Sequence, residues 1–233
     1  MNKKISVFLP LRSGSQRVKN KNTRPFLQNG KSIFQLKMCQ LIELTDYIDE
    51  IIISTNDSDV IQQAQEFLNS KVKLIERPEY LCLSTTKVVD LINYVPTVIA
   101  SDHVFWLHAT APFVDAEDYL SAIKLYSEKV LNGNHDSLMS VNKLQQFIWS
   151  DQEKRVINVD RSINPWPNTQ DLEPLFEINH AFYISSRDNY LQFNDRIGQN
   201  PCLFETTSVK KIDIDWPDDF ELAVKIASTM DLK

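Results

Sequence analysis

The chain has 233 residues, of which 42% are hydrophobic and 24% are charged, a composition typical of a folded globular protein and not of a disordered one. Its formal net charge of -6 at pH 7 argues against a general nucleic-acid coat and favours a small anionic ligand held by local positive charge. The apolar run near the amino terminus covers only residues 5–11, too short for a signal peptide or a membrane span, so we expect a cytoplasmic protein that binds neither membrane nor nucleic acid.

Strand-like and helix-like segments alternate through the first 130 residues. We expect strands at 4–9, 50–55, 72–76 and 103–109. We expect helices at 58–68, 86–99 and 116–131, and a first helix that begins at Ser32, with Gln35 completing a capping box. This alternation is typical of βαβ units, and it predicts an α/β fold with a mostly parallel twisted sheet and helices on both faces.

The pattern changes between residues 138 and 178, where short alternating stretches surround two tryptophans and a proline-rich bend. We interpret 138–178 as an inserted β-rich arm, with 1–137 and 179–233 forming the core. Two tryptophans and a proline-rich bend in such a segment would need a partner surface, so we predict a dimerisation arm; a flap folded on its own domain is the alternative. After the arm we expect a strand at 208–214 and a closing helix at 217–230.

A basic loop follows the first expected strand directly. It begins at Leu11 and holds four cations within twelve residues. In open α/β sheets ligands bind beyond the carboxyl ends of the strands, so we predict that Arg12 and Lys21 bind a nucleoside triphosphate. The loop is neither a Walker A motif nor GxGxxG, and a basic loop alone can be a solvated surface. Further donors expected at the phosphates are Ser13, Gly14 and Ser15.

Two carboxylates stand two residues apart near the other end of the chain. On the expected strand, Asp213 and Asp215 would point to one face, about 7 Å apart. Helix capping is the alternative; it suits Asp218 and Asp219 at the start of the closing helix but does not explain Asp213. Because Mg²⁺ prefers carboxylate oxygens, we predict that Asp213 and Asp215 form a magnesium site.

Five motifs in chain order carry a resemblance to a known family. They are the loop LPLRSGSQRVKNKN at 9–22, the stretches 54–57 and 108–112, the stretch 179–183 and the IDID at 212–215. Together they resemble the acylneuraminate cytidylyltransferases, which activate sialic acid and related nonulosonic acids. The resemblance implies a Rossmann-like nucleotidyltransferase fold, usually a homodimer joined by the arm. It also implies Mg²⁺-dependent cytidylyl transfer from CTP to the anomeric hydroxyl of a nine-carbon α-keto acid, with release of pyrophosphate.

The resemblance also assigns roles to residues of this chain. The catalytic residues would be Arg12, Lys21 and Asp215. The nucleotide-binding residues would be Leu11, Arg12, Ser13, Gly14, Ser15, Lys21, Asn22 and Arg77. The sugar acid would contact His108, Gln170, Phe182 and Tyr183, and Asp213 and Asp215 would bind the metal.

Some positions depart from the pattern of this family. Gln16 stands where a lysine is usual, although Arg17 follows it; His108 replaces a glutamine and His180 replaces a glycine. The nucleotide end is therefore intact and the sugar end altered, which favours a variant acceptor such as legionaminic or pseudaminic acid. Two alternatives stay open: a nucleotidyltransferase with another sugar or base, and a catalytically weak nucleotide-binding homologue. The retained cations and acids argue against the second.

Overall fold

Seven strands form the central sheet of the computed structural model, which describes residues 4–15 and 17–232. The strand order is β3-β2-β1-β4-β8-β5-β9. Their bounds are Ile5–Pro10 for β1, Glu50–Thr55 for β2, Val72–Glu76 for β3, His103–Leu107 for β4, Ser137–Leu144 for β5, Leu175–Ser186 for β8 and Pro201–Thr206 for β9. Strand β8 runs antiparallel to β4 and β5, whereas the other neighbouring pairs are parallel. The predicted mostly parallel sheet is confirmed.

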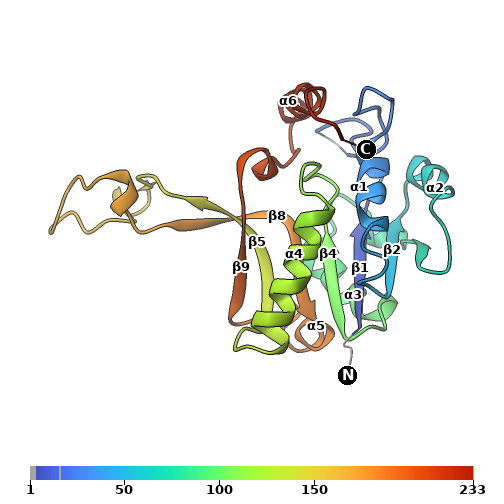
Figure 1. Ribbon diagram of the computed structural model, residues 1–233, viewed down its shortest axis with the longest axis horizontal. Coiled ribbons are helices and arrows are strands. Elements are labelled where there is room, and N and C mark those ends of the chain that lie inside the picture. Colours follow the sequence, from blue (N-terminus) through green and yellow to red (C-terminus); the bar gives the residue numbers. More distant parts are fainter. Residues whose placement is uncertain (1–3, 16, 233) are drawn as a thin grey trace.

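Helices cover both faces of this sheet (Figure 1). Their bounds are Ile33–Ile42 for α1, Ser58–Ala64 for α2, Val88–Val98 for α3, Ala116–Tyr126 for α4, Arg187–Phe193 for α5 and Pro217–Ala227 for α6. Helices α1, α2, α4 and α6 share one apolar core with the sheet, while α3 and α5 cover the other face. Within the described ranges, no helix is long and apolar enough to cross a membrane.

The predicted start of the first helix is confirmed. The hydroxyl of Ser32 accepts from the backbone N–H of Gln35 at 3.2 Å, and the Gln35 side chain accepts from the backbone N–H of Ser32 at 3.1 Å. This reciprocal pair satisfies two donors that a helix terminus otherwise leaves unpaired. Helix α1 therefore begins where the local sequence indicates, beside the end of the basic loop.

The expected strand at 208–214 is wrong. The edge strand β9 lies earlier, and Ser208–Lys211 form a short 3-10 turn after it, with Ser208 in a left-handed conformation. The apolar alternation at 212–215 has another cause: Ile214 is fully buried in the core, and its N–H donates to Thr110 O at 2.9 Å. A buried Ile214 between Asp213 and Asp215 gives the same alternation of polar and apolar residues as a half-buried strand.

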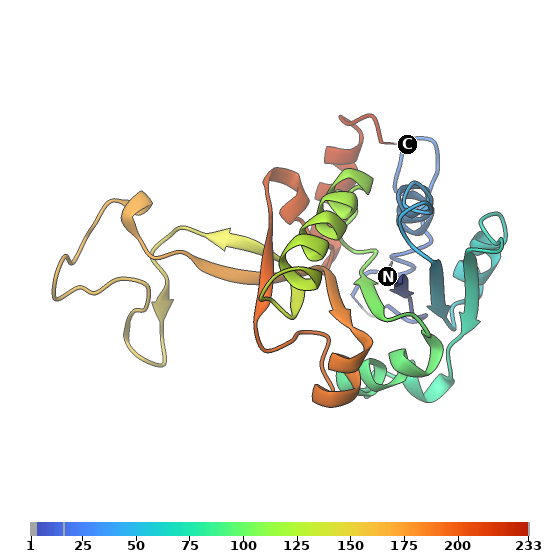
Figure 2. The same cartoon turned by 60° about the horizontal axis from the view of Figure 1, so that its bottom comes forward.

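The inserted segment projects from the sheet as a long arm (Figures 1 and 2). Strands β5 and β8 run from the sheet into its base, so the expected boundaries at 138 and 178 fall inside these strands. A small antiparallel pair, β6 at Trp149–Ser150 and β7 at Arg155–Val156, lies within it. Its surface exposes Ile163, Trp166 and Trp149 at 83%, 65% and 56% of their area. Apolar exposure of this kind is costly for a surface without a partner.

A lysine is buried beneath the loop that follows β4. The ammonium of Lys37, on α1, donates to Ala111 O at 3.0 Å, to Val114 O at 2.9 Å and to the Tyr119 hydroxyl at 2.5 Å. Burial lowers the pKa of Lys37 from 10.5 to about 7, although Asp115 and Asp118 oppose this shift. The lysine thereby ties α1 to the loop that carries Ala109 and Thr110 to the pocket described below.

Lys37 should make the stability of the protein depend on pH. Between its folded pKa of about 7 and its ordinary pKa of 10.5, the unfolded chain binds more protons, so the free energy of unfolding should rise with pH in this window. Urea unfolding of the wild type and of Lys37→Met at about pH 6 and about pH 9 measures this rise. The variant should lose the part of the rise in unfolding free energy that Lys37 causes. Lys124→Met, at an exposed position of α4, is the control and should keep it. Equal rises in wild type and Lys37→Met would contradict the expectation.

Candidate active site

A pocket of about 620 Å³ lies at the carboxyl ends of β1 and β4. Ligands of open α/β sheets bind in this region, beyond the strand ends. The pocket joins the amino-terminal basic loop to the carboxyl-terminal acids, with β4 and the loop after it between them. Of the residues predicted from sequence, it is lined by Leu11, Arg12, Ser15, Lys21, Asn22, Arg77, His108, Asp213 and Asp215.

The basic loop and the acid pair contact each other directly. Arg17 Nη2 lies 2.9 Å from Asp215 Oδ1, and Lys21 Nζ lies 4.0 Å from the same oxygen. Lys21 also donates to the carbonyl of Ile214 at 2.5 Å. Burial lowers the pKa of Lys21, while the charges of Asp215 and Asp213 oppose this. These opposite charges neutralise one another where the basic loop meets the acid pair.

The backbone of the loop is bent at Gly14, whose φ of +72° lies in the left-handed region that glycine tolerates. A Cβ added there would meet no atom within 4 Å, so the backbone conformation and not space accounts for the glycine. The N–H of Ser13 donates to Asn56 Oδ1 at 3.0 Å, so this donor already has a partner within the protein. Neither Ser13 nor Gly14 lines the pocket itself, and Gln16 lies outside the described residues.

Two arginines beside the basic loop differ in how their donors are used. Arg77 is 4% exposed and donates to the carbonyls of Leu11 and Ser54, so it anchors the start of the loop while lining the pocket. Arg12 is exposed and makes one long hydrogen bond, 3.5 Å from Nη1 to Leu83 O. In 4–15 and 17–232 the other N–H groups of Arg12 have no hydrogen-bond partner, so they can serve an anionic ligand.

The acid pair is asymmetric. Oxygen Oδ1 of Asp213 is buried without a hydrogen-bond partner among the described residues, whereas Asp215 is partly exposed. Burial raises the pKa of Asp213, and the charge of Asp215 adds to the effect, against a hydrogen bond from Thr110. Leaving a carboxylate oxygen desolvated and unpaired is costly, and a cation bound there would remove the cost. The residues present thus fit a divalent cation held by two carboxylates.

No cluster of three or more His, Cys, Asp or Glu side chains suited to a metal occurs in 4–15 and 17–232. Such a cluster would characterise a closed site built by the protein alone. Mg²⁺ instead commonly takes one or two carboxylates together with substrate phosphates and water. The pair Asp213 and Asp215 matches that second arrangement.

His108 lies at the end of β4 as a neutral acceptor. Its Nε2 accepts from Trp106 Nε1 at 2.9 Å and lies 3.2 Å from Arg196 Nη1. Burial, followed by the charge of Arg196, lowers the pKa of His108 to about 3. With donors facing Nε2, the ring proton belongs on Nδ1. His108 therefore acts by hydrogen bonding and does not bring positive charge to the pocket.

His180 occupies a position whose backbone suits glycine. Its φ is +58°, in the left-handed region, which explains why a glycine fits this position in the family that the sequence resembles. Its Nδ1 lies 2.7 Å from the Tyr183 hydroxyl, and its ring lies in the pocket. A non-glycine residue in this region costs on the order of 1 kcal/mol, a cost that this chain sustains to place an imidazole at the pocket.

Three residues expected to contact the sugar acid do not line this pocket. Phe182 is fully buried against Phe105 and Tyr119, which corrects its predicted contact with the sugar acid. Neighbouring residues of a strand point to opposite faces of the sheet, so Phe182 and Tyr183 cannot lie on the same face. Tyr183 is buried in the opposite core, and its hydroxyl contacts His180, which does line the pocket. Gln170 is exposed in the arm, within the short turn Thr169–Asp171.

Arg196 and Thr110 line the pocket but escaped the sequence predictions. Thr110 lies inside the stretch 108–112 that carries the resemblance, so its place in that motif was a usable signal. Arg196 follows α5, in a loop without strand, helix or motif pattern. Only the packing of α5 against the sheet brings it beside His108.

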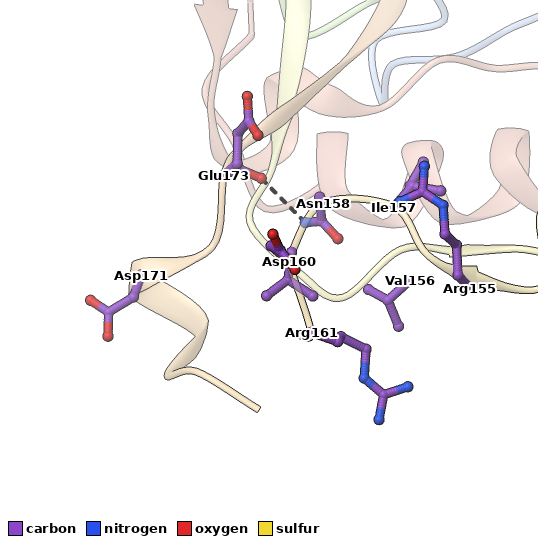
Figure 3. A pocket seen from close by; sticks show the side chains of 9 residues that line it. Arg155, Val156, Ile157, Asn158, Asp160, Arg161, Asp171 and Glu173 are labelled. Carbon is purple, nitrogen blue, oxygen red and sulfur yellow. Dashed lines mark hydrogen bonds between the residues drawn. The ribbon is translucent and has the colours of Figure 1, made fainter. Parts of the chain in front are cut away.

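A second hollow of about 630 Å³ lies within the arm (Figure 3). There the side-chain amide of Asn158 donates to the carbonyl of Glu173 at 3.2 Å, which closes one side. Figure 3 shows the side chains of Arg161 and Asp171 pointing away from each other, so these two charged groups do not converge on a ligand. The pocket at the carboxyl ends of β1 and β4, where opposite charges meet, is therefore the candidate active site.

Comparison with protein families and curated sequences gives a consistent result. Residues 7–233 match the family model described as Cytidylyltransferase. The chain is 25% identical over 228 residues to the N-acylneuraminate cytidylyltransferase of Escherichia coli, covering 97% of this chain and 52% of that protein. It is also 25% identical over 237 residues to the CMP-N,N'-diacetyllegionaminic acid synthase of Legionella pneumophila, covering 96% of each. The chain thus spans about half the length of the first relative and nearly all of the second.

Solved structures share the fold at lower sequence identity. A CMP:2-keto-3-deoxy-manno-octonic acid synthetase complexed with CTP has a TM-score of 0.64 at 17% identity, covering 96% of this chain and 98% of that one. A 4-diphosphocytidyl-2C-methyl-D-erythritol synthase from Anaerococcus prevotii has a TM-score of 0.66 at 13% identity, covering 97% and 96%. These similarities confirm the expected Rossmann-like nucleotidyltransferase fold.

Proposed function

Because the chain belongs to the cytidylyltransferase family, we propose that it transfers a cytidylyl group from CTP to the anomeric hydroxyl of a nine-carbon α-keto sugar acid, releasing pyrophosphate. The observation that carries the proposal is the meeting of Arg17 and Lys21 with Asp215 in one pocket. Cations for a triphosphate and carboxylates for its counter-cation are both required by phosphoryl transfer, and they come from opposite ends of the chain. Both curated relatives carry names of enzymes that make CMP-linked nine-carbon sugar acids.

The basic loop performs the nucleotide side of the reaction. Triphosphate oxygens replace Asp215 as the partner of Arg17 and Lys21, while Arg12 offers its free donors and Ser15 its hydroxyl. The anomeric hydroxyl then attacks the α-phosphate in line, and the fixed cations stabilise charge that develops on the phosphoryl oxygens. No covalent enzyme intermediate is required.

Asp213 and Asp215 are the residues that would hold Mg²⁺. When bound, the ion neutralises phosphate charge and orients the triphosphate. Release of Arg17 and Lys21 from Asp215 leaves this carboxylate free for a cation, and the unpaired Oδ1 of Asp213 gains a partner. Cation and nucleotide should therefore bind cooperatively.

The acceptor end supports a variant sugar acid. His108 and His180 occupy positions of glutamine and glycine in the family pattern, and both lie in the pocket. Their rings fill space and present hydrogen-bonding edges, which alters the shape available to substituents of the sugar. Legionaminic or pseudaminic acid is therefore a better expected acceptor than N-acetylneuraminic acid.

Pyrophosphate release tests the proposal. The purified chain should be assayed with each of the four nucleoside triphosphates against N-acetylneuraminic, legionaminic, pseudaminic and 3-deoxy-manno-octulosonic acids, with and without Mg²⁺. We expect release with CTP and a nine-carbon acid, dependent on the metal. Activity with another nucleotide or only with the eight-carbon acid would replace the substrate assignment. Release from no combination would remove the proposed function.

We also propose that the arm joins two chains into a homodimer, since Ile163, Trp149 and Trp166 present apolar surface on it. Light scattering should give twice the chain mass of 27.0 kDa at micromolar concentration. Ile163→Glu should shift the equilibrium toward monomer because it places a charge within the buried surface. Gln152→Glu, also exposed on the arm, adds the same charge without removing an apolar side chain and should leave the mass unchanged. A wild-type monomer would return the arm to the flap alternative.

A further inference from the structure

Arg196 is a cation that lines the pocket but does not come from the basic loop. It follows α5 and lies beside His108. Its Cζ lies 4.1 Å from the ring centroid of Tyr183 and 4.9 Å from that of Trp106. Contacts with aromatic faces hold a guanidinium in place without consuming its N–H donors. Two rings from neighbouring strands therefore fix the position of Arg196 and leave most of its donors available.

The hydrogen-bond partners of this guanidinium are neutral. Nη1 lies 3.2 Å from His108 Nε2, and Nη2 donates to the Tyr183 hydroxyl at 3.3 Å. Burial lowers the pKa of His108 to about 3 and raises that of Tyr183, so neither carries a charge near neutral pH. Within 4–15 and 17–232, no ion pair joins Arg196 to a carboxylate. A half-buried cation without a counter-charge is poorly compensated and favours an anionic ligand.

The position of Arg196 relative to the other cations indicates which anion it meets. Arg17 and Lys21 face Asp215, at the edge where the phosphates are expected. Arg196 instead lies against His108 at the end of β4, and Tyr183 connects it to His180. In the proposed function these histidines lie at the acceptor end of the pocket. An anionic group there would belong to the acceptor and not to the nucleotide.

We propose that Arg196 is a specificity-determining residue that binds a carboxylate of the acceptor. The inference rests on the proposed function and adds the chemistry by which the acceptor is recognised. A planar guanidinium matches the two oxygens of a carboxylate, which an ester or a neutral sugar does not offer. The aromatic rings that hold Arg196 also exclude water from one side of the contact, which strengthens it.

Equilibrium binding separates this contact from catalysis. N,N'-diacetyllegionaminic acid, N-acetylneuraminic acid and the methyl ester of each are titrated into the CTP-bound protein without divalent metal, so that turnover does not occur. Wild type should bind at least one acid about tenfold or more tightly than its ester, the scale of a hydrogen-bonded charge. Arg196→Gln should lose this preference while CTP affinity stays unchanged. Arg196→Lys, which keeps the charge but not the fork, should keep part of it.

Arg24→Gln is the matched control, because this exposed arginine lies over the Phe220 ring, 4.3 Å from its centroid, outside the pocket. It should behave as wild type in both titrations. Three results would overturn the inference: no acid preference in wild type, a preference retained by Arg196→Gln, or a tenfold loss of CTP affinity, which would assign Arg196 to the phosphates. Pyrophosphate release is assayed separately, because it tests the proposed function and not the contact of Arg196. If the chain prefers the acid through Arg196 but releases no pyrophosphate, the transfer reaction is disproved and the carboxylate contact stands.

Discussion

Replacing Asp215 with asparagine should lower kcat/KM by on the order of a hundredfold or more, because the amide keeps the shape of the side chain but loses the charge that binds a cation. The fold should be nearly unaffected. The pair between Asp215 and Arg17 is half exposed, and such pairs contribute at most about 1 kcal/mol. Steady-state kinetics over a range of Mg²⁺ concentrations and a thermal melt check the two parts of this expectation.

The control for Asp215→Asn is Asp218→Asn, which removes an exposed carboxylate from the first turn of α6 outside the pocket. It should change stability slightly through the helix dipole and leave kinetics unchanged. The Mg²⁺ concentration for half-maximal rate should rise in Asp215→Asn alone. Near-normal kinetics in that variant would remove the metal assignment and leave Asp215 as a partner of the basic loop only.

Arg12→Ala is the second substitution with a large expected effect. Its guanidinium lines the pocket and, among the described residues, makes one long hydrogen bond, to Leu83 O, so the folded chain gains little from it. Loss of one fixed charge-stabilising donor costs about 2 to 4 kcal/mol in the transition state, roughly 30- to 1,000-fold in kcat/KM. Initial rates with CTP varied at saturating acceptor measure this loss.

Lys19→Ala controls for the removal of positive charge from the loop, since Lys19 is exposed and does not line the pocket. It should lower the rate at most slightly, through long-range attraction that salt screens. A loss below tenfold for Arg12→Ala, or equal losses for both variants, would count against a direct phosphate contact of Arg12.

The elements predicted most accurately are those specified by local chemistry. Apolar runs bounded by turns indicated β1 to β4, and the pair Ser32 and Gln35 indicated where α1 begins. The failure at 208–214 has the same origin, because alternation reports which side chains are buried and not what buries them. Ile214 is buried beside Thr110 without a strand partner. The same alternation places Phe182 and Tyr183 in opposite cores, so one ligand cannot contact both side chains.

Local sequence thus indicated the strands β1 to β4 and the first helix cap, because these depend on residues within a few positions of one another. The basic loop was also evident from sequence, and the family pattern paired it with the distant acids. Only the tertiary structure decided which groups meet: Arg17 with Asp215, Lys37 with the loop after β4, and Arg196 with His108. Such contacts join residues far apart in the chain, and their desolvation and charge depend on the packing of whole helices against the sheet, which no local pattern records.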